Sequence, residues 1–198
     1  MFYLFQKGGP IMWPLFLTSV ISLAVILERL FFVILVKIRR DPKAVEALLA
    51  HAESGRIPEA IEAGEASHDY VAVTLTYGLK NRDKSLSNAL LKAANQELKR
   101  FNAGLFVLDT AITLAPLLGL LATVTGMIHA FGLLGAKELE APTVITGGIA
   151  EALIGTAFGL GIAILALIPF NYLNSKLEEA RHEIEDASTQ LELILKTN

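Results

Sequence analysis

The sequence predicts an all-α membrane protein with three transmembrane helices and long cytoplasmic helical extensions. Hydrophobic residues make up 53% of the 198 positions and charged residues only 19%, whereas ordinary soluble domains carry roughly 25% charged residues. Three long stretches are almost free of charge: residues 11–27 with their continuation at 30–36, residues 110–136, and residues 141–175. A spanning helix needs about 20 apolar residues. Amphipathic helices of a soluble bundle would interrupt such stretches with polar residues every few positions.

Basic residues beside these stretches predict the orientation of the chain. Lys37, Arg39, Arg40 and Lys43 follow the first span, whereas the short connection between the second and third spans offers a single lysine, Lys137. Basic residues concentrate on the cytoplasmic side of a membrane. The predicted order is therefore a periplasmic N-terminus (1–10), transmembrane helix 1 (11–36), a cytoplasmic helical segment (37–103), transmembrane helix 2 (104–136), a short periplasmic loop (137–142), transmembrane helix 3 (143–173) and a cytoplasmic helical tail (174–198).

The cytoplasmic segment is predicted to form short helices that lead into the second span. Because proline suits the first turn of a helix, and because turn residues separate the Ala- and Leu-rich runs, helices are expected over residues 42–53, 58–63 and 69–80. Ser85 or Ser87 is expected to cap a further helix, whose one face carries Leu86, Leu90, Ala93, Glu97 and Phe101. This helix is expected to continue unbroken through the second span, over a length of about 70 Å.

The tail carries a heptad pattern that continues from the third span. Apolar residues recur alternately four and three positions apart at Leu173, Leu177, Ala180, Ile184, Ala187, Leu191 and Ile194. Such a seam predicts a helix packed along one face. Two partners fit it equally well: the cytoplasmic helices of the same chain, or another subunit.

The sequence offers no chemistry typical of a soluble enzyme. It contains no cysteine, no phosphate-binding glycine loop and no His-Glu-x-x-His motif. Its four histidines are scattered and are expected to be surface or interface residues. A net charge of −3 argues against a nucleic-acid partner. We therefore expect no enzymatic activity and no metal or organic cofactor.

Glu151 is a carboxylate well inside the predicted third span. An ionised carboxylate facing lipid would cost at least about 2.5–3.5 kcal/mol, so Glu151 is expected to face the bundle interior, a water-filled cavity or a cationic partner. A place in an ion pathway and a structural hydrogen bond between helices both fit this position. Asp109, at the cytoplasmic end of the second span, is expected to be a solvated or paired end residue.

Small residues recur every four positions in the second and third spans, which lets helices approach closely. The four sets are Ala115, Gly119 and Thr123; Ala122, Gly126 and Ala130; Gly148, Ala152 and Thr156; and Gly155, Gly159 and Ala163. These faces exceed what one three-helix subunit can bury, which predicts a closed homo-oligomeric ring. Thr123 and Thr156 both fall near the middle of their spans. A lone membrane threonine usually bonds its own helix, whereas two at matching depth would line one polar track.

Two segments resemble signatures of a known family. Residues 115–131 resemble the second-span signature of the MotA/TolQ/ExbB proton channel family, and residues 147–160 resemble its third-span signature. Glu28 and Arg29 after the first apolar run, and the three-span topology, are similar to the ExbB/TolQ branch. One departure is Ala122, where the family usually has glycine, which predicts a slightly wider helix contact there.

The resemblance implies a proton-motive-force-driven motor or stator subunit of the bacterial inner membrane. It implies a homopentameric ring around the helices of an ExbD/TolR-type partner dimer, a single-span protein with an intramembrane aspartate. Protons would be the coupling ion, and energy would pass to the periplasm or outer membrane. The implied pathway residues are Thr123, Thr156 and Glu151, with Pro116, Gly119, Gly126, Gly148, Gly155 and Gly159 as packing residues. The alternative is a structural membrane scaffold or assembly subunit without ion flux.

Overall fold

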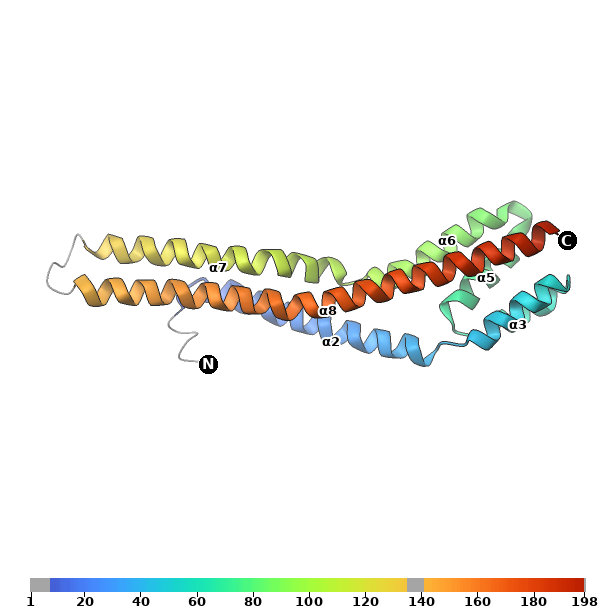
Figure 1. The fold of residues 1–198 in the computed structure, drawn as a ribbon, viewed down its shortest axis with the longest axis horizontal. Helices are drawn as coiled ribbons and strands as arrows, with labels where there is room; N and C mark the ends of the chain where they lie inside the picture. The colour runs from blue at the N-terminus through green and yellow to red at the C-terminus, as the bar shows by residue number, and fades with distance from the viewer. Residues whose placement is uncertain (1–7, 135–140, 198) are drawn as a thin grey trace. The chain divides into compact units, whose positions relative to one another are not determined.

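The computed structural model describes residues 8–134 and 141–197, and within these ranges the chain is all-helical (Figure 1). Its seven described helices are α2 (Met12–Ile38), α3 (Pro42–Glu53), α4 (Ile57–Glu65), α5 (Tyr70–Lys80), α6 (Arg82–Asn102), α7 (Leu105–Leu134) and α8 (Ala141–Thr197). Helices α2, α7 and α8 each contain a segment long and apolar enough to cross a membrane. Residues 1–7 of the predicted N-terminal segment and 137–140 of the predicted loop lie outside the described residues.

The chain divides into two compact units, to which α2 and α8 both contribute. The apolar unit contains residues 8–28 and 104–171, and the polar unit contains residues 29–103 and 172–197.

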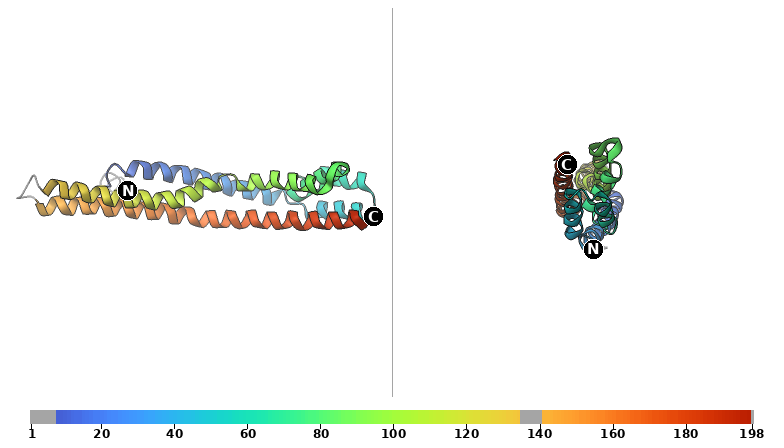
Figure 2. Two further views of the ribbon diagram at one scale, coloured as in Figure 1. Left: turned by 90° about the horizontal axis from the view of Figure 1, so that it is seen from above. Right: turned by 90° about the vertical axis from the view of Figure 1, so that its right-hand side faces the viewer.

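In the apolar unit, α7 and the first part of α8 run side by side (Figures 1 and 2). Met12 and Leu15 at the start of α2 form a small core with Ala115 of α7, and all three side chains are at most 1% exposed. Large apolar side chains point outward along all three helices, among them Trp13, Leu117 and Leu165 at 67%, 62% and 71% exposure. Such an outward apolar surface suits a hydrocarbon environment.

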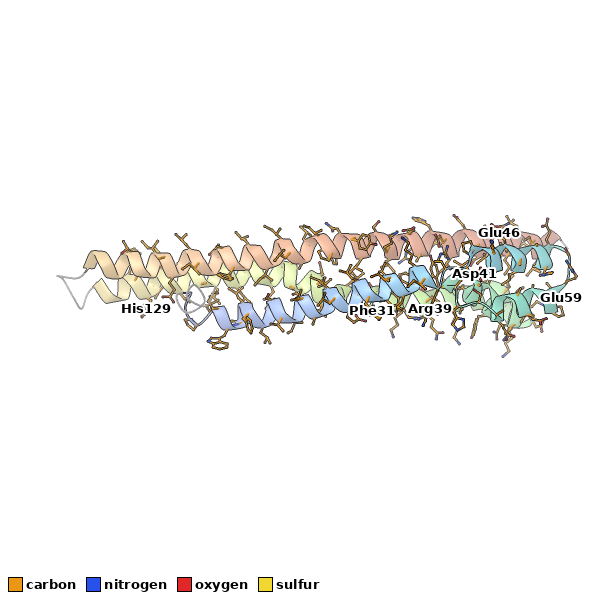
Figure 3. The ribbon with its side chains drawn as sticks, turned by 90° about the horizontal axis from the view of Figure 1, so that it is seen from below. Phe31, Arg39, Asp41, Glu46, Glu59 and His129 are labelled. Atoms are coloured by element: carbon orange, nitrogen blue, oxygen red, sulfur yellow. The ribbon has the colours of Figure 1, made fainter. Side chains whose placement is uncertain are left out.

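In the polar unit, local capping fixes where the short helices begin. Asp41 accepts a hydrogen bond from the Ala44 amide at 3.2 Å and precedes Pro42 in the first turn of α3. Figure 3 shows Arg39 and Asp41 at the turn between α2 and α3. Ser85 departs from helical geometry and accepts from the Asn88 amide at 3.4 Å. The predicted helix starts near residues 42, 69 and 85 are therefore confirmed, because short polar side chains satisfy the first free amides of a helix.

The prediction of one continuous helix from residue 87 to residue 134 is wrong. The chain leaves helical geometry at Ala103 (ψ 136°), and Gly104 adopts a φ of +77°. Glycine adopts this left-handed conformation without steric cost, and it commonly terminates helices. Helices α6 and α7 are therefore separate elements.

The tail forms the last turns of α8, which runs without interruption from Ala141 to Thr197. The heptad residues Leu173, Leu177, Ala180, Ile184, Ala187 and Leu191 are all at most 9% exposed within the polar unit. The prediction of a helical, packed tail is confirmed, and the seam packs on helices of the same chain. Contact with another subunit stays a prediction.

Candidate functional site

The α7/α8 contact is built from glycines whose missing side chains allow the two backbones to approach. A Cβ atom added at Gly119 would lie 3.0 Å from the Thr156 Cα atom, and one at Gly126 would lie 3.0 Å from the Ala152 Cβ atom. At Gly159 the added atom would contact the Ala115 carbonyl oxygen and lie 3.1 Å from the Gly119 Cα atom. These distances are shorter than ordinary carbon–carbon contacts, so the helices could not keep this separation with larger residues.

The same contact continues toward the other end of the two helices. A Cβ atom at Gly148 would lie 2.6 Å from the Ala130 Cβ atom, and one at Gly155 would overlap the Ala122 methyl group. Gly155 therefore provides the space that Ala122 fills, and the departure from the family pattern at Ala122 is accommodated by the absence of a side chain opposite it.

Thr123 of α7 and Thr156 of α8 meet in the middle of this contact, and their hydroxyl groups are hydrogen-bonded to each other. The Thr156 hydroxyl also lies 2.9 Å from the Gly119 carbonyl oxygen on the opposite helix. The Thr123 hydroxyl lies 3.3 Å from the same Gly119 oxygen and 3.5 Å from the Ala152 oxygen of α8. The structure thus brings the two predicted threonines together and connects both helices through them.

Pro116 lies two turns before Thr123, in the interior of α7. Proline has no amide hydrogen, so the Ile112 carbonyl loses its usual helical donor. Helix α7 is nonetheless continuous from Leu105 to Leu134.

Glu151 is half-buried and lies on a different face of α8 from Thr156. Five residues separate them, which corresponds to a rotation of about 140° around the helix axis. The Glu151 carboxylate instead lies against the backbone of Gly9, just before α2. The structure therefore does not place all three predicted pathway residues on one face.

A charged cluster in the polar unit was not predicted from the sequence. Asp69 is 1% exposed and accepts hydrogen bonds from Arg40 at 2.8 and 2.9 Å, and from the Asp41 and Val71 amides at 2.8 Å each. Arg40 also forms an ion pair of 2.7 Å with Glu183 of α8. Asp69 thus caps α5 and at the same time binds the turn that precedes α3.

Tyr70 completes this cluster by donating a hydrogen bond to Glu183. The Arg40 guanidinium carbon lies 4.7 Å from the centre of the Tyr70 ring. Burial, followed by the hydrogen bond to Glu183, raises the pKa of the Tyr70 phenol well above its ordinary value. The helix start at Asp69 is visible in the sequence, but the partners come from distant segments and leave no local pattern.

Arg29 stabilises the end of α6, a role that was not predicted from the sequence. It is 8% exposed and donates a hydrogen bond of 2.9 Å to the Arg100 carbonyl near the end of α6. Carbonyl groups in the last turn of a helix lack partners within the helix. Arg29 therefore caps α6 just before the chain turns at Gly104.

A family model matches residues 65–186, which include the whole α7/α8 contact. The chain belongs to the MotA/TolQ/ExbB proton channel family. The resemblance found in the sequence is thus confirmed. Family membership and three apolar helices make the chain a multi-pass protein of the bacterial inner membrane.

Several relatives match over nearly the whole chain. The ExbB-like 1 protein of Synechocystis sp. is 38% identical over 200 residues, which cover 97% of this chain and 78% of the relative. The biopolymer transport protein exbB1 of Vibrio cholerae is 30% identical over 207 residues, and the match covers 96% of this chain and 86% of the relative. The Tol-Pal system protein TolQ of Haemophilus influenzae is 35% identical over 94 residues, 48% of this chain and 41% of TolQ. These matches support the ExbB/TolQ branch.

Proposed function

We propose that this protein is a proton-motive-force-driven motor subunit that forms a homopentameric ring. The ring conducts protons together with an ExbD/TolR-type partner dimer and transmits energy to the periplasm or outer membrane. Its N-terminus faces the periplasm and its tail the cytoplasm. Family membership and the resemblance to ExbB and TolQ proteins support this role.

The observation that carries the proposal is the hydrogen-bonded pair of Thr123 and Thr156. Each hydroxyl has one hydrogen to donate and two lone pairs to accept with. One hydrogen joins the two hydroxyls and the other has a carbonyl acceptor, the nearest being Gly119 at 2.9 Å. Lone pairs remain on both oxygens. The pair is therefore suited to accept a hydrogen bond from a protonated carboxyl group or a water molecule.

The proposal includes a partner because this chain carries a single carboxylate, Glu151, well inside its predicted spans. Glu151 is a single carboxylate within the span formed by α8, and relays through membranes use a series of ionisable groups. A partner aspartate would supply the missing group. In a ring, the threonine pair of each subunit would meet it in turn, which couples loss of the proton to a step between subunits.

The proposal is tested with Thr123→Val and Thr156→Val variants, because valine nearly matches threonine in shape but lacks the hydroxyl. Proton flux is measured in liposomes that contain this protein with and without an ExbD/TolR-type partner. Both variants should assemble as the parent does but lose most of the partner-dependent flux.

Thr125→Val is the matched control on the same helix. The Thr125 hydroxyl is exposed and bonds to the Leu121 and Ala122 carbonyls of its own helix at 2.8 and 3.2 Å, so its loss should leave flux unchanged.

The tight glycine contact on its own also fits a membrane scaffold without ion flux. In that case both valine variants would keep parent-level activity at equal amounts of assembled protein. A leucine at either threonine would instead damage assembly, because extra volume in a close-packed contact is destabilising. Parent-level flux in both valine variants would therefore reject the proton pathway and favour the scaffold.

A further inference from the structure

The segment just before α2 forms a tight turn that contains no side chain at Gly8 or Gly9. The Met12 amide donates to the Gly9 carbonyl at 3.2 Å, and the Trp13 amide donates to the Pro10 carbonyl at 3.3 Å. Gly9 adopts a φ of +71°, a conformation that other residues rarely adopt. The turn is thus held by its own hydrogen bonds and by glycine geometry.

This turn lies directly against the Glu151 side chain. A Cβ atom added at Gly9 would overlap the Glu151 Oε1 atom and would lie 2.9 Å from Cδ and 3.4 Å from Cγ. One turn further along α8, a Cβ atom at Gly8 would lie 3.3 Å from the Ile154 Cγ2 atom. The carboxylate therefore occupies the space that a side chain at Gly9 would need.

The contact, and not the backbone conformation alone, sets Gly9 apart. Gly55 in the polar unit has almost the same φ, +72°, but an added Cβ atom there would meet nothing within 4 Å. Glycine at Gly55 is explained by its turn. Glycine at Gly9 satisfies a second requirement, since it makes room for an ionisable group of the membrane span.

We propose that Gly9 is a positioning residue for Glu151. The backbone at Gly9 forms a wall on which the carboxylate rests, and this wall determines where the carboxylate points from its face of α8. The inference builds on the proposed function, in which Glu151 belongs to the proton pathway. Displacing the wall would move the carboxylate without changing its chemistry.

Proximity is tested with a disulfide, because the chain contains no native cysteine. In a Glu151→Cys variant the sulfur would lie near the present Glu151 Cγ position, 3.4 Å from the Cβ position of residue 9, which is within reach of disulfide geometry. The double variant Gly9→Cys with Glu151→Cys should form an intramolecular cross-link under mild oxidation in membranes. Gly9→Cys with Leu153→Cys is the control, since the Leu153 side chain is 62% exposed. Equal cross-linking of both pairs would overturn the proposal.

Positioning is tested by the rate at which a membrane-permeant carbodiimide labels Glu151, followed by mass spectrometry of the full-length protein. Gly9→Ala should raise this rate several-fold, because the added methyl group pushes the carboxylate off the turn. Gly55→Ala introduces the same backbone strain and should leave the rate unchanged. An unchanged rate in Gly9→Ala would overturn the proposal.

A shorter acidic side chain at position 151 should relieve the overlap that Gly9→Ala creates. Glu151→Asp withdraws the carboxylate by one methylene, so Gly9→Ala should lower the thermal unfolding midpoint less in this background than in the parent. Equal losses in both backgrounds would overturn the positioning role. None of these readouts requires proton flux. A protein that cross-links and labels as expected but conducts no protons would support the inference while rejecting the proposed function alone.

Discussion

Gly159→Ala is the substitution that should most directly separate Thr156 from its carbonyl acceptor on α7, the Gly119 oxygen. The added methyl group would point at α7, against the Ala115 carbonyl oxygen and 3.1 Å from the Gly119 Cα atom. Both are backbone atoms, so the overlap cannot be relieved by a side-chain rotation. Helix α7 must therefore move away from α8 at this level.

The size of that movement follows from contact distances. Carbon atoms in contact prefer a separation of about 3.5–4.0 Å, so relieving the 3.1 Å approach alone requires a shift of at least about 0.5 Å, and the closer approach to the Ala115 oxygen requires more. The same segment of α7 carries the Gly119 oxygen, which lies 2.9 Å from the Thr156 hydroxyl. Adding this shift to 2.9 Å gives at least about 3.4 Å, beyond the roughly 2.5–3.0 Å of a hydroxyl hydrogen bond.

The effect on stability should be smaller than the effect on function. Overpacking in a dense contact costs about 1–3 kcal/mol, and replacing glycine by alanine within a helix returns about 1 kcal/mol. The free energy of unfolding should therefore fall by about 0–2 kcal/mol. Gly161→Ala on the same helix should gain the higher helix propensity of alanine without any overlap, because an added Cβ atom there meets nothing within 4 Å.

The assay is partner-dependent proton flux in liposomes at equal amounts of assembled protein, together with the thermal unfolding midpoint. Gly159→Ala should lose most of its flux while remaining folded, and Gly161→Ala should match or exceed the parent in both measurements. Parent-level flux in Gly159→Ala would show that the spacing of α7 and α8 at Gly119 does not matter for proton transfer.

Two further predictions concern the polar unit. Asp69→Ala should destabilise the full-length protein in detergent by about 3–5 kcal/mol, since it removes the buried acceptor shared by Arg40 and the Asp41 and Val71 amides. Glu65→Ala, which removes an exposed ion pair with Lys80, should cost at most about 1 kcal/mol, and similar losses in the two variants would contradict this difference. Because the pKa of Tyr70 is raised in the folded state, the stability it contributes is fully present below its ordinary pKa of about 10 and is lost as the pH rises further. Thermal midpoints should therefore fall less steeply above pH 10 in Tyr70→Phe than in the parent, and identical slopes would argue against the buried phenol.

Features with a local signal could be predicted from the sequence. The three apolar helices follow from runs without charge, and the tail follows from a seven-residue repeat in which Ile184 and Leu191 are buried and the last member, Ile194, is partly buried. The start of α5 follows from Asp69, a residue that caps helices. The meeting of Thr123 and Thr156 follows from equal depth in two spans joined by a short connection.

The break between α6 and α7 had a signal that charge and hydropathy patterns obscured. Lys99 and Arg100 lie in the last turn of α6, and Gly104 follows it, which is a common arrangement at helix ends. The distant contacts of Asp69 and Glu151, by contrast, have no local signal in the sequence. Arg40 lies far from Asp69 in the chain, and Gly9 lies far from Glu151, so no spacing or periodicity connects these residues.

The hydroxyl pair at the α7/α8 contact can arrange its two hydrogens in opposite orders. In one order Thr123 donates to Thr156, which donates to the Gly119 oxygen at 2.9 Å. In the other, Thr156 donates to Thr123, which donates to the same oxygen at 3.3 Å. Exchanging these orders reverses the bond dipole between the two helices while every heavy atom stays in place. An approaching charge would favour one order over the other, so this contact can respond to the ionisation of a neighbouring group by electrical polarisation, without repacking the helices.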